Sequence, residues 1–176
     1  MVSVKTGQGA GLLQDKRQQE QGFTLLEVTI VLVISGILAA IALPSFLNQA
    51  SKAKQIEAKM YLGTLNRAQQ SYILERTQFA DTVNHLGIAF PSSLNYGYSI
   101  RLNSAGNQYA VHDAKSLSVS LRPYVGVVAI AQSGTGDARI EVVLCESKAA
   151  QQGKAEQPVI NATSVKCASS TKPVGQ

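Results

Sequence analysis

The sequence predicts an α+β fold in which one long N-terminal helix packs on a small antiparallel β-sheet. Residues 22–43 are apolar apart from Glu27, and the next charged residue is Lys52. The following segment has helical periodicity, and the second half of the chain carries short β-type runs separated by turn sequences. A chain of 176 residues can bury one modest core beyond the apolar segment, so we expect a single small domain there.

The apolar run is long enough to cross a bilayer as a helix, which takes about 20 residues. Residues 1–22 before it are polar and rich in Gly, Gln and charge, so we treat them as a processing segment outside the fold. A carboxylate inside such a run is costly in hydrocarbon and is a functional hypothesis by default. Glu27 therefore indicates that the segment is more than a membrane anchor.

An amphipathic helical pattern follows Pro44. Its apolar positions recur at spacings that are sums of three and four: Leu47, Ala50, Ala58, Tyr61, Leu65, Ala68 and Tyr72. We expect polar side chains to lie away from this face: Lys52, Lys59, Asn66, Gln70 and Arg76. The pattern predicts one helix from about Phe23 to about Glu75, kinked or loosened at Pro44 because proline removes a backbone hydrogen bond.

The remainder of the domain is predicted to be mainly β. Asp81 is placed to cap a short helix that ends at Leu86, with Gly87 stopping it. Strand-like runs then occupy Tyr96–Leu102, Gln108–His112, Tyr124–Ala131 and Ala138–Cys145. The last two runs flank the turn sequence QSGTGD and predict a hairpin, so the sheet extends over about 95–145. Residues 146–176 are rich in Lys, Gln and Ser and are predicted to form a C-terminal loop.

Charge and cysteine content narrow the class of protein. The net charge is +5, but the 16 basic residues are scattered, so we predict no direct nucleic-acid binding. Cys145 and Cys167 lie in no CxxC pair and have no nearby His, which argues against a zinc site. An exported domain would join them in a disulfide, whereas a cytosolic protein would keep two free thiols; an export segment favours the disulfide.

No catalytic constellation is present, and we expect neither an enzyme nor a cofactor. His85 and His112 are isolated in the sequence and are expected to be surface or packed residues rather than ligands. Asp113, Asp137 and Glu141 could bind Ca²⁺ if they converged, but they lack EF-hand spacing. We therefore expect solvated loop acids and no metal site.

Three interpretations fit the first fifty residues. The first is a signal anchor that holds a small exported domain. The second is a secretory signal peptide, for which Ala40-Ile41-Ala42 offers a small-x-small cleavage pattern. The third rests on the order of residues at the head of the run, Gly22-Phe23-Thr24-Leu25-Leu26-Glu27, followed by about twenty apolar residues.

This order resembles the type IV prepilin signal. The resemblance implies that a membrane peptidase removes residues 1–22 by cutting after Gly22 and methylates Phe23. It implies that residues 23–43 remain as a membrane and filament-core segment, with Thr24 and Glu27 serving processing and assembly. Pro44 matches the helix-loosening proline of these pilins. The segments ALPSFLNQASKAKQIEAK and LNRAQQSYILERTQFA resemble the shoulder of cyanobacterial-type pilins, and a Cys145–Cys167 bridge resembles their C-terminal disulfide.

The resemblance implies a pilin fold, with residues 44–176 as the globular head, and a structural subunit of a type IV pilus that serves motility, adhesion or DNA uptake. Alternatives are a pseudopilin of a type II secretion system and a membrane-anchored domain that never polymerises. The implied partners are other pilins in a homo- or heteropolymer, the prepilin peptidase and methyltransferase, and a pilus or secretion platform in the inner membrane. The subunit would span that membrane once, N-terminus in the cytoplasm, before entering an extracellular pilus or a periplasmic pseudopilus.

Overall fold

The computed structural model describes residues 23–103, 108–132 and 136–175, and it confirms the predicted α+β class. The chain divides into two compact units, residues 1–43 and 44–176. Helix α1 spans Leu25–Arg76. The strands are β1 (Tyr96–Leu102), β2 (Tyr109–Ser116), β3 (Tyr124–Gln132), β4 (Ala138–Ser147), β5 (Val159–Ile160), β6 (Val165–Lys166) and β7 (Thr171–Pro173). The predicted leader, including Gly22, lies outside the described residues.

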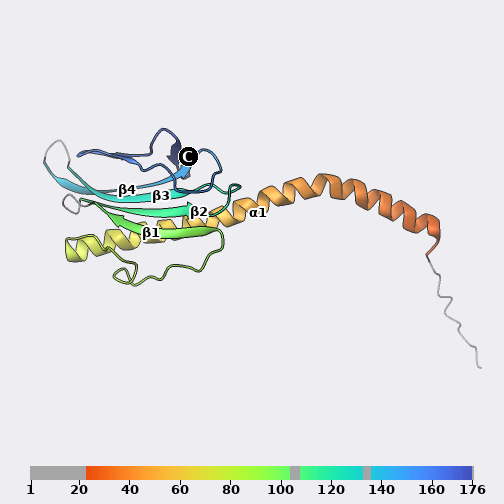
Figure 1. Ribbon diagram of the computed structural model, residues 1–176, viewed down its shortest axis with the longest axis horizontal. Coiled ribbons are helices and arrows are strands. Elements are labelled where there is room, and N and C mark those ends of the chain that lie inside the picture. The colour runs from red at the N-terminus through yellow and green to blue at the C-terminus, as the bar shows by residue number, and fades with distance from the viewer. Residues whose placement is uncertain (1–22, 104–107, 133–135, 176) are drawn as a thin grey trace, which may run out of the picture. The chain divides into compact units, whose positions relative to one another are not determined.

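The second unit, which we call the head, is built on an antiparallel sheet in the order β1-β2-β3-β4-β7 (Figure 1). β1 has its predicted bounds, whereas β2 runs four residues past the predicted end at His112 because Asp113–Ser116 continue the pairing with β1. The predicted hairpin is formed by β3 and β4. β7 was not predicted, because three residues that include a proline carry no strand signal of their own.

The predicted short helix after α1 is wrong. Residues 83–87 form turns, in which Leu86 N–H donates to Val83 O and Gly87 N–H donates to Asn84 O, both at 3.1 Å. The carboxylate of Asp81 contacts His85 Nδ1 at 2.8 Å, so this carboxylate is engaged by a ring rather than by the first turn of a helix. Gly87 ends the turn with φ of 67°, a left-handed conformation in which glycine carries no steric penalty.

The helix face that meets the sheet is rotated from the predicted one. Its buried residues are Ala58, Leu62, Leu65, Asn66, Gln69 and Ile73. Tyr61, Ala68 and Tyr72 are half-buried at the margin of this face, and Leu47 is exposed. Asn66, which was expected to face away, is only 3% exposed. The prediction failed for a physical reason. It placed the polar side chain of Asn66 in solvent, whereas the sheet supplies hydrogen-bond partners for it.

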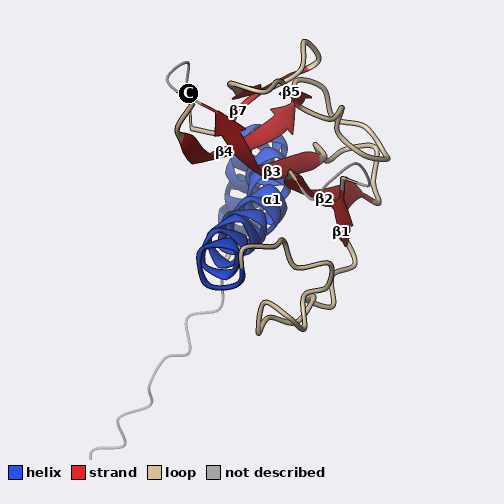
Figure 2. Ribbon diagram, turned by 90° about the vertical axis from the view of Figure 1, so that its left-hand side faces the viewer, coloured by secondary structure: helices blue, strands red, loops and turns tan. Residues whose placement is uncertain are grey.

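The head has three layers, with α1 on one face of the sheet and the C-terminal segment on the other (Figure 2). Alternate residues of β3 pack on opposite faces of the sheet. Tyr124 and Val128 pack in clusters with α1, whereas Val125 and Val127 pack with residues of the C-terminal segment. β3 is therefore buried on both faces for most of its length, which explains its nearly continuous apolar sequence.

A buried polar cluster joins α1 to the middle of the sheet. Asn66 Oδ1 lies 2.7 Å from His112 Nδ1, and Asn66 Nδ2 donates to Val143 O at 3.3 Å. Gly126 faces Asn66, and a Cβ at this position would lie 2.5 Å from Asn66 Oδ1. The missing side chain of Gly126 therefore makes the space in which the Asn66 amide reaches across three strands.

The charge state of His112 follows from this environment. Its ring is fully buried, and Nε2 has no hydrogen-bond partner among the described residues. Burial lowers the pKa of His112 to about 4, although the charge of Asp113 acts in the opposite sense. A neutral ring with its proton on Nδ1 can donate to Asn66 Oδ1, so the cluster is built for the uncharged imidazole.

Replacement of Gly126 by Ala is expected to lower the free energy of unfolding by about 1–3 kcal/mol, because the new methyl group displaces the Asn66 amide. Urea unfolding followed by tyrosine fluorescence measures this change. Gly97→Ala is the matched control, since its Cβ would meet Leu117 at an ordinary 3.9 Å. In an Asn66→Ala background the Gly126→Ala penalty should shrink; an undiminished penalty would show that Asn66 is not the source of the clash.

The head is expected to lose stability as pH falls from 6.5 toward 4, because His112 keeps its proton off in the folded state and gains it readily when unfolded. The stability is fully present above the unfolded pKa near 6.5 and falls by about 3 kcal/mol by pH 4. His112→Gln should flatten this part of the pH profile of unfolding. Glu146 and Asp113, whose pKa values are lowered by folding, lose their contributions only as pH falls below their ordinary values of 4.5 and 3.8, so they define a separate step. An identical profile in the variant would contradict the assignment.

Candidate functional site

The N-terminal end of α1 is capped by the residues that the sequence singled out. Thr24 precedes the helix, and its Oγ1 accepts a hydrogen bond from Glu27 N–H at 3.2 Å. Its carbonyl accepts from Val28 N–H at the same distance. Glu27 thus occupies the third helical position, where a carboxylate also interacts favourably with the positive end of the helix dipole. The T-x-x-E spacing is a local capping signal that the sequence prediction did not use.

The first part of α1 is apolar on every side. All described side chains from Phe23 to Leu43 are exposed within the subunit, with Leu32 at 65% and Ile41 at 72%. A stretch of 18 residues within α1 has a mean hydropathy of 2.6, and α1 is long and apolar enough to cross a membrane. A helix that is apolar all round needs lipid or other helices around it. Pro44 lies inside α1, and its loosening of the helix stays a prediction.

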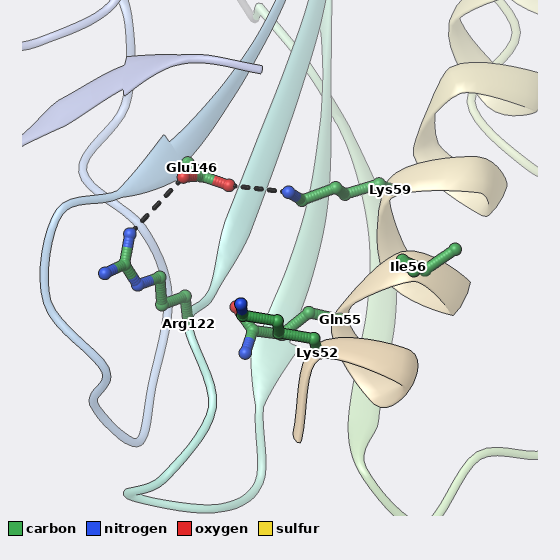
Figure 3. A pocket seen from close by; sticks show the side chains of 6 residues that line it. All are labelled: Lys52, Gln55, Ile56, Lys59, Arg122 and Glu146. Carbon is green, nitrogen blue, oxygen red and sulfur yellow. Dashed lines mark hydrogen bonds and ion pairs between the residues drawn. The ribbon is translucent and has the colours of Figure 1, made fainter. Parts of the chain in front are cut away.

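One edge of the head carries a cluster of charges around Glu146 (Figure 3). The Glu146 carboxylate lies 2.9 Å from Lys59 Nζ, 3.3 Å from Arg122 Nη1 and 3.0 Å from Lys172 Nζ. These three cations come from α1, the loop before β3, and β7. Burial would raise the pKa of Glu146, but hydrogen bonds from Lys59 and Lys172 outweigh it and hold that pKa below its usual value. Glu146 is therefore ionised and ties three elements to β4.

An open hollow of about 410 Å³ lies beside this cluster. Its lining comes from α1, the loop before β3 and the end of β4: Lys52, Gln55, Ile56, Lys59, Arg122 and Glu146. Figure 3 shows the Lys52 side chain extending toward Arg122, with Gln55 beside it. Gln55 Oε1 accepts the hydroxyl hydrogen of Tyr124 at 3.0 Å, which fixes the floor of the hollow. Cations outnumber carboxylates here, so the hollow is positive.

A second buried carboxylate lies on the opposite face of the sheet, and the expectation for it was wrong. Asp113 is 1% exposed rather than solvated in a loop. Arg101 contacts both of its oxygens, at 2.7 and 3.0 Å, and Lys154 Nζ lies 3.1 Å away. Burial would raise the pKa of Asp113, but the hydrogen bonds from Arg101 and Lys154 lower it overall. The strand alternation of β2 turns Asp113 inward, where it anchors the C-terminal segment through Lys154.

The other candidate ligands are placed apart. Glu141 accepts a hydrogen bond from Val165 N–H at 2.8 Å, and His85 pairs with Asp81 on the surface. Asp113, Asp137 and Glu141 do not converge: no group of three potential metal ligands occurs among residues 23–103, 108–132 and 136–175.

A disulfide closes the C-terminal layer. Cys145 in β4 is bonded to Cys167, with the two Cα atoms 5.7 Å apart. Cys145 is buried and packs among the apolar residues of the sheet face opposite α1. The bridge thus holds the segment after β4 against that face. β7 then returns to pair with β4, placing Thr171 opposite Ser147.

Comparison with known proteins identifies the family. Residues 55–168 match the family described as "Type IV pilin-like G and H, putative", and residues 17–43 match the prokaryotic N-terminal methylation motif. The chain belongs to the type IV pilin-like family. The first match lies within the head, and the second contains Phe23, Thr24 and Glu27 at the capped end of α1.

Individual pilins and pseudopilins are similar to this chain. The type IV major pilin protein PilA of Myxococcus xanthus is 40% identical over 112 residues, which cover 64% of this chain and 49% of PilA. The type IV major pilin protein PilE1 of Neisseria gonorrhoeae is 35% identical over 74 residues, 42% of this chain and 45% of PilE1. The type II secretion system core protein G of Vibrio cholerae is 36% identical over 104 residues, 53% of this chain and 71% of that protein.

The chain thus spans about half the length of the pilins that it matches. No solved structure matches it. The apolar start of α1, together with the family, supports a membrane-anchored pilin.

Removal of the disulfide by the double substitution Cys145→Ala and Cys167→Ala is expected to lower the free energy of unfolding by about 3 kcal/mol, because the bridge closes a loop of 22 residues. Urea unfolding of the detergent-solubilised chain measures the loss, and limited proteolysis should show faster cleavage between residues 148 and 170. Chemical reduction of the wild-type protein serves as the matched comparison. Unchanged unfolding and protease resistance would show that Asp113 and the apolar contacts hold the C-terminal layer without the bridge.

Proposed function

We propose that this pilin is a structural subunit of a type IV pilus. The observation that carries the proposal is the likeness to PilA, because 112 matched residues exceed the 52 residues of α1 and must include part of the head. A shared membrane helix alone would suit several export machines, whereas a shared head supports a shared filament surface.

The N-terminal segment supports processing by a prepilin peptidase. In this proposal the enzyme cuts after Gly22 and methylates the new N-terminus at Phe23. Thr24 caps α1 at the next position, so the helix begins within two residues of the proposed cleavage site. The mature chain then retains the apolar half of α1, which anchors the subunit in the inner membrane before assembly.

The same apolar segment then forms the core of the filament. Lipid and neighbouring helices are both apolar, so the transfer of residues 28–43 between them changes little hydrophobic free energy. Position along the filament must therefore be set by polar groups. The carboxylate of Glu27 can pair with the N-terminal ammonium of Phe23 in a neighbouring subunit, which would fix the stagger between the two chains.

A pseudopilin of a type II secretion system is the second candidate. The likeness to core protein G of Vibrio cholerae favours it, because the alignment covers 71% of that protein. The two candidates differ in where the filament lies: a pilus reaches the cell surface, whereas a pseudopilus stays in the periplasm and serves secretion of other proteins.

Shearing of cells, followed by mass spectrometry of the released filaments, tests the proposal. A pilus subunit should appear there as a chain that begins at methylated Phe23. A chain that begins at Met1 or Leu43 would contradict processing by a prepilin peptidase. Absence from sheared filaments, combined with a secretion defect on deletion of the gene, would support the pseudopilin instead.

Replacement of Glu27 by Ala or by Gln is expected to leave cleavage after Gly22 intact and to reduce entry into filaments strongly. Loss of one partner of a charge pair in low dielectric costs about 3–5 kcal/mol. The Gln variant removes the charge and keeps the size of the side chain, while the backbone N–H at this position still donates to Thr24 Oγ1. Sheared filament yield is the measurement. Filaments in normal amount from Glu27→Gln would show that the charge of Glu27 is not required.

A further inference from the structure

One edge of the head carries more cations than carboxylates. On the edge formed by β4 and β7, Lys59, Arg122 and Lys172 contact Glu146, and Lys52 lines the same hollow. Within the described residues, Lys52 forms no ion pair and is exposed. One carboxylate cannot neutralise four cations, so this edge has room and charge for a second carboxylate.

One exposed carboxylate of the head has no ion-pair partner within the described residues. Glu57 is exposed on α1, and it has neither a hydrogen bond nor an ion pair within the described part of the head. The other head carboxylates in that part all interact with neighbours in the subunit. Glu57 lies close to β1: burial, and after it the charge of Glu57, raises the pKa of Tyr98 to about 12.

Glu57 and the hollow cannot meet within one subunit. Lys59 reaches Glu146 on β4, whereas Glu57 influences Tyr96 and Tyr98 on β1, and these strands lie three positions apart in the sheet. On α1 itself, Glu57 and Lys52 are separated by about 140° around the helix axis at 3.6 residues per turn. The negative group and the positive hollow therefore lie on different sides of the same head.

We propose that Glu57 of one subunit docks into the positive hollow of the next subunit, beside Lys52 and Arg122. The inference rests on the proposed assembly into a filament, and it names the head contact that orients one copy against another. The contact is heterologous, since each subunit offers a different surface on each side. Contacts of this type do not close into a two-fold dimer and can propagate as an open helical array.

Cross-linking within assembled filaments tests the contact. A chain that carries both Glu57→Cys and Lys52→Cys, treated with a short bis-maleimide, should give a ladder of multimers on a denaturing gel. Each single-cysteine chain should stay monomeric under the same treatment. The matched control pairs Glu57→Cys with Lys115→Cys, because Lys115 is exposed on β2 and does not line the hollow.

Wild-type filaments that form normally, with no ladder from the Glu57–Lys52 pair or an equal ladder from the Glu57–Lys115 pair, would overturn the docking contact and leave the pilus subunit intact. Failure of the wild-type chain to form filaments would overturn both.

Charge reversal provides the second measurement. Glu57→Lys should lower the yield of sheared filaments about tenfold, because it places a cation against the positive hollow. Lys115→Glu, a reversal of the same size outside the hollow and on a different element, should leave the yield unchanged. Circular dichroism of each variant confirms that the head is folded, since both side chains are exposed and unpaired in the subunit. Equal yields from Glu57→Lys and wild type would contradict the proposal.

Discussion

The head depends on one constraint: its sheet is apolar on both faces, but the described part of the chain supplies a single helix to cover them. Alternate residues of β3, such as Val127 and Val128, belong to different clusters on the two sides. The helix covers one face, so the other would meet water if the C-terminal segment did not cover it. That segment has little regular structure to hold it, because β5, β6 and β7 have only two or three residues each. The disulfide and the Lys154–Asp113 pair therefore replace the packing that a second helix would provide.

The interface between α1 and the sheet differs from the opposite face, because it contains buried polar groups. Asn66 bonds to His112 and to the backbone of β4, and it needs the space above Gly126 to do so. Such a cluster adds less stability than apolar packing would, but it allows few alternative alignments of helix and sheet. The cluster therefore fixes which face of α1 meets the sheet.

Much of the fold could be predicted from local sequence signals. Features that depend on contacts between residues far apart in the sequence could not. The bounds of β1 and the start of β3 follow from β-type residues bounded by turn sequences. The inward position of Asn66 depends on Gly126, sixty residues later, and the burial of Asp113 depends on Lys154 in a segment that looked like a loop. The Thr24–Glu27 cap could have been predicted from the sequence, since the two residues are only three positions apart. The hollow could not be predicted without the fold, because its lining residues come from α1, the loop before β3 and the end of β4.

In the proposed filament, charged residues would set the alignment between subunits that apolar packing cannot set. The membrane half of α1 is apolar on all sides, so sliding past an identical helix changes its hydrophobic free energy little. In the proposed filament, the carboxylate of Glu27 would set the position of one helix along the axis of the next. It does not fix rotation about the axis as firmly, because it lies near one end of the helix. A second charge contact in the head, displaced from α1 toward β4, would restrain rotation through a longer lever arm. If both proposed contacts form, one at the start of the apolar segment and one at the edge of the sheet, they would orient subunits whose apolar surfaces alone specify no alignment.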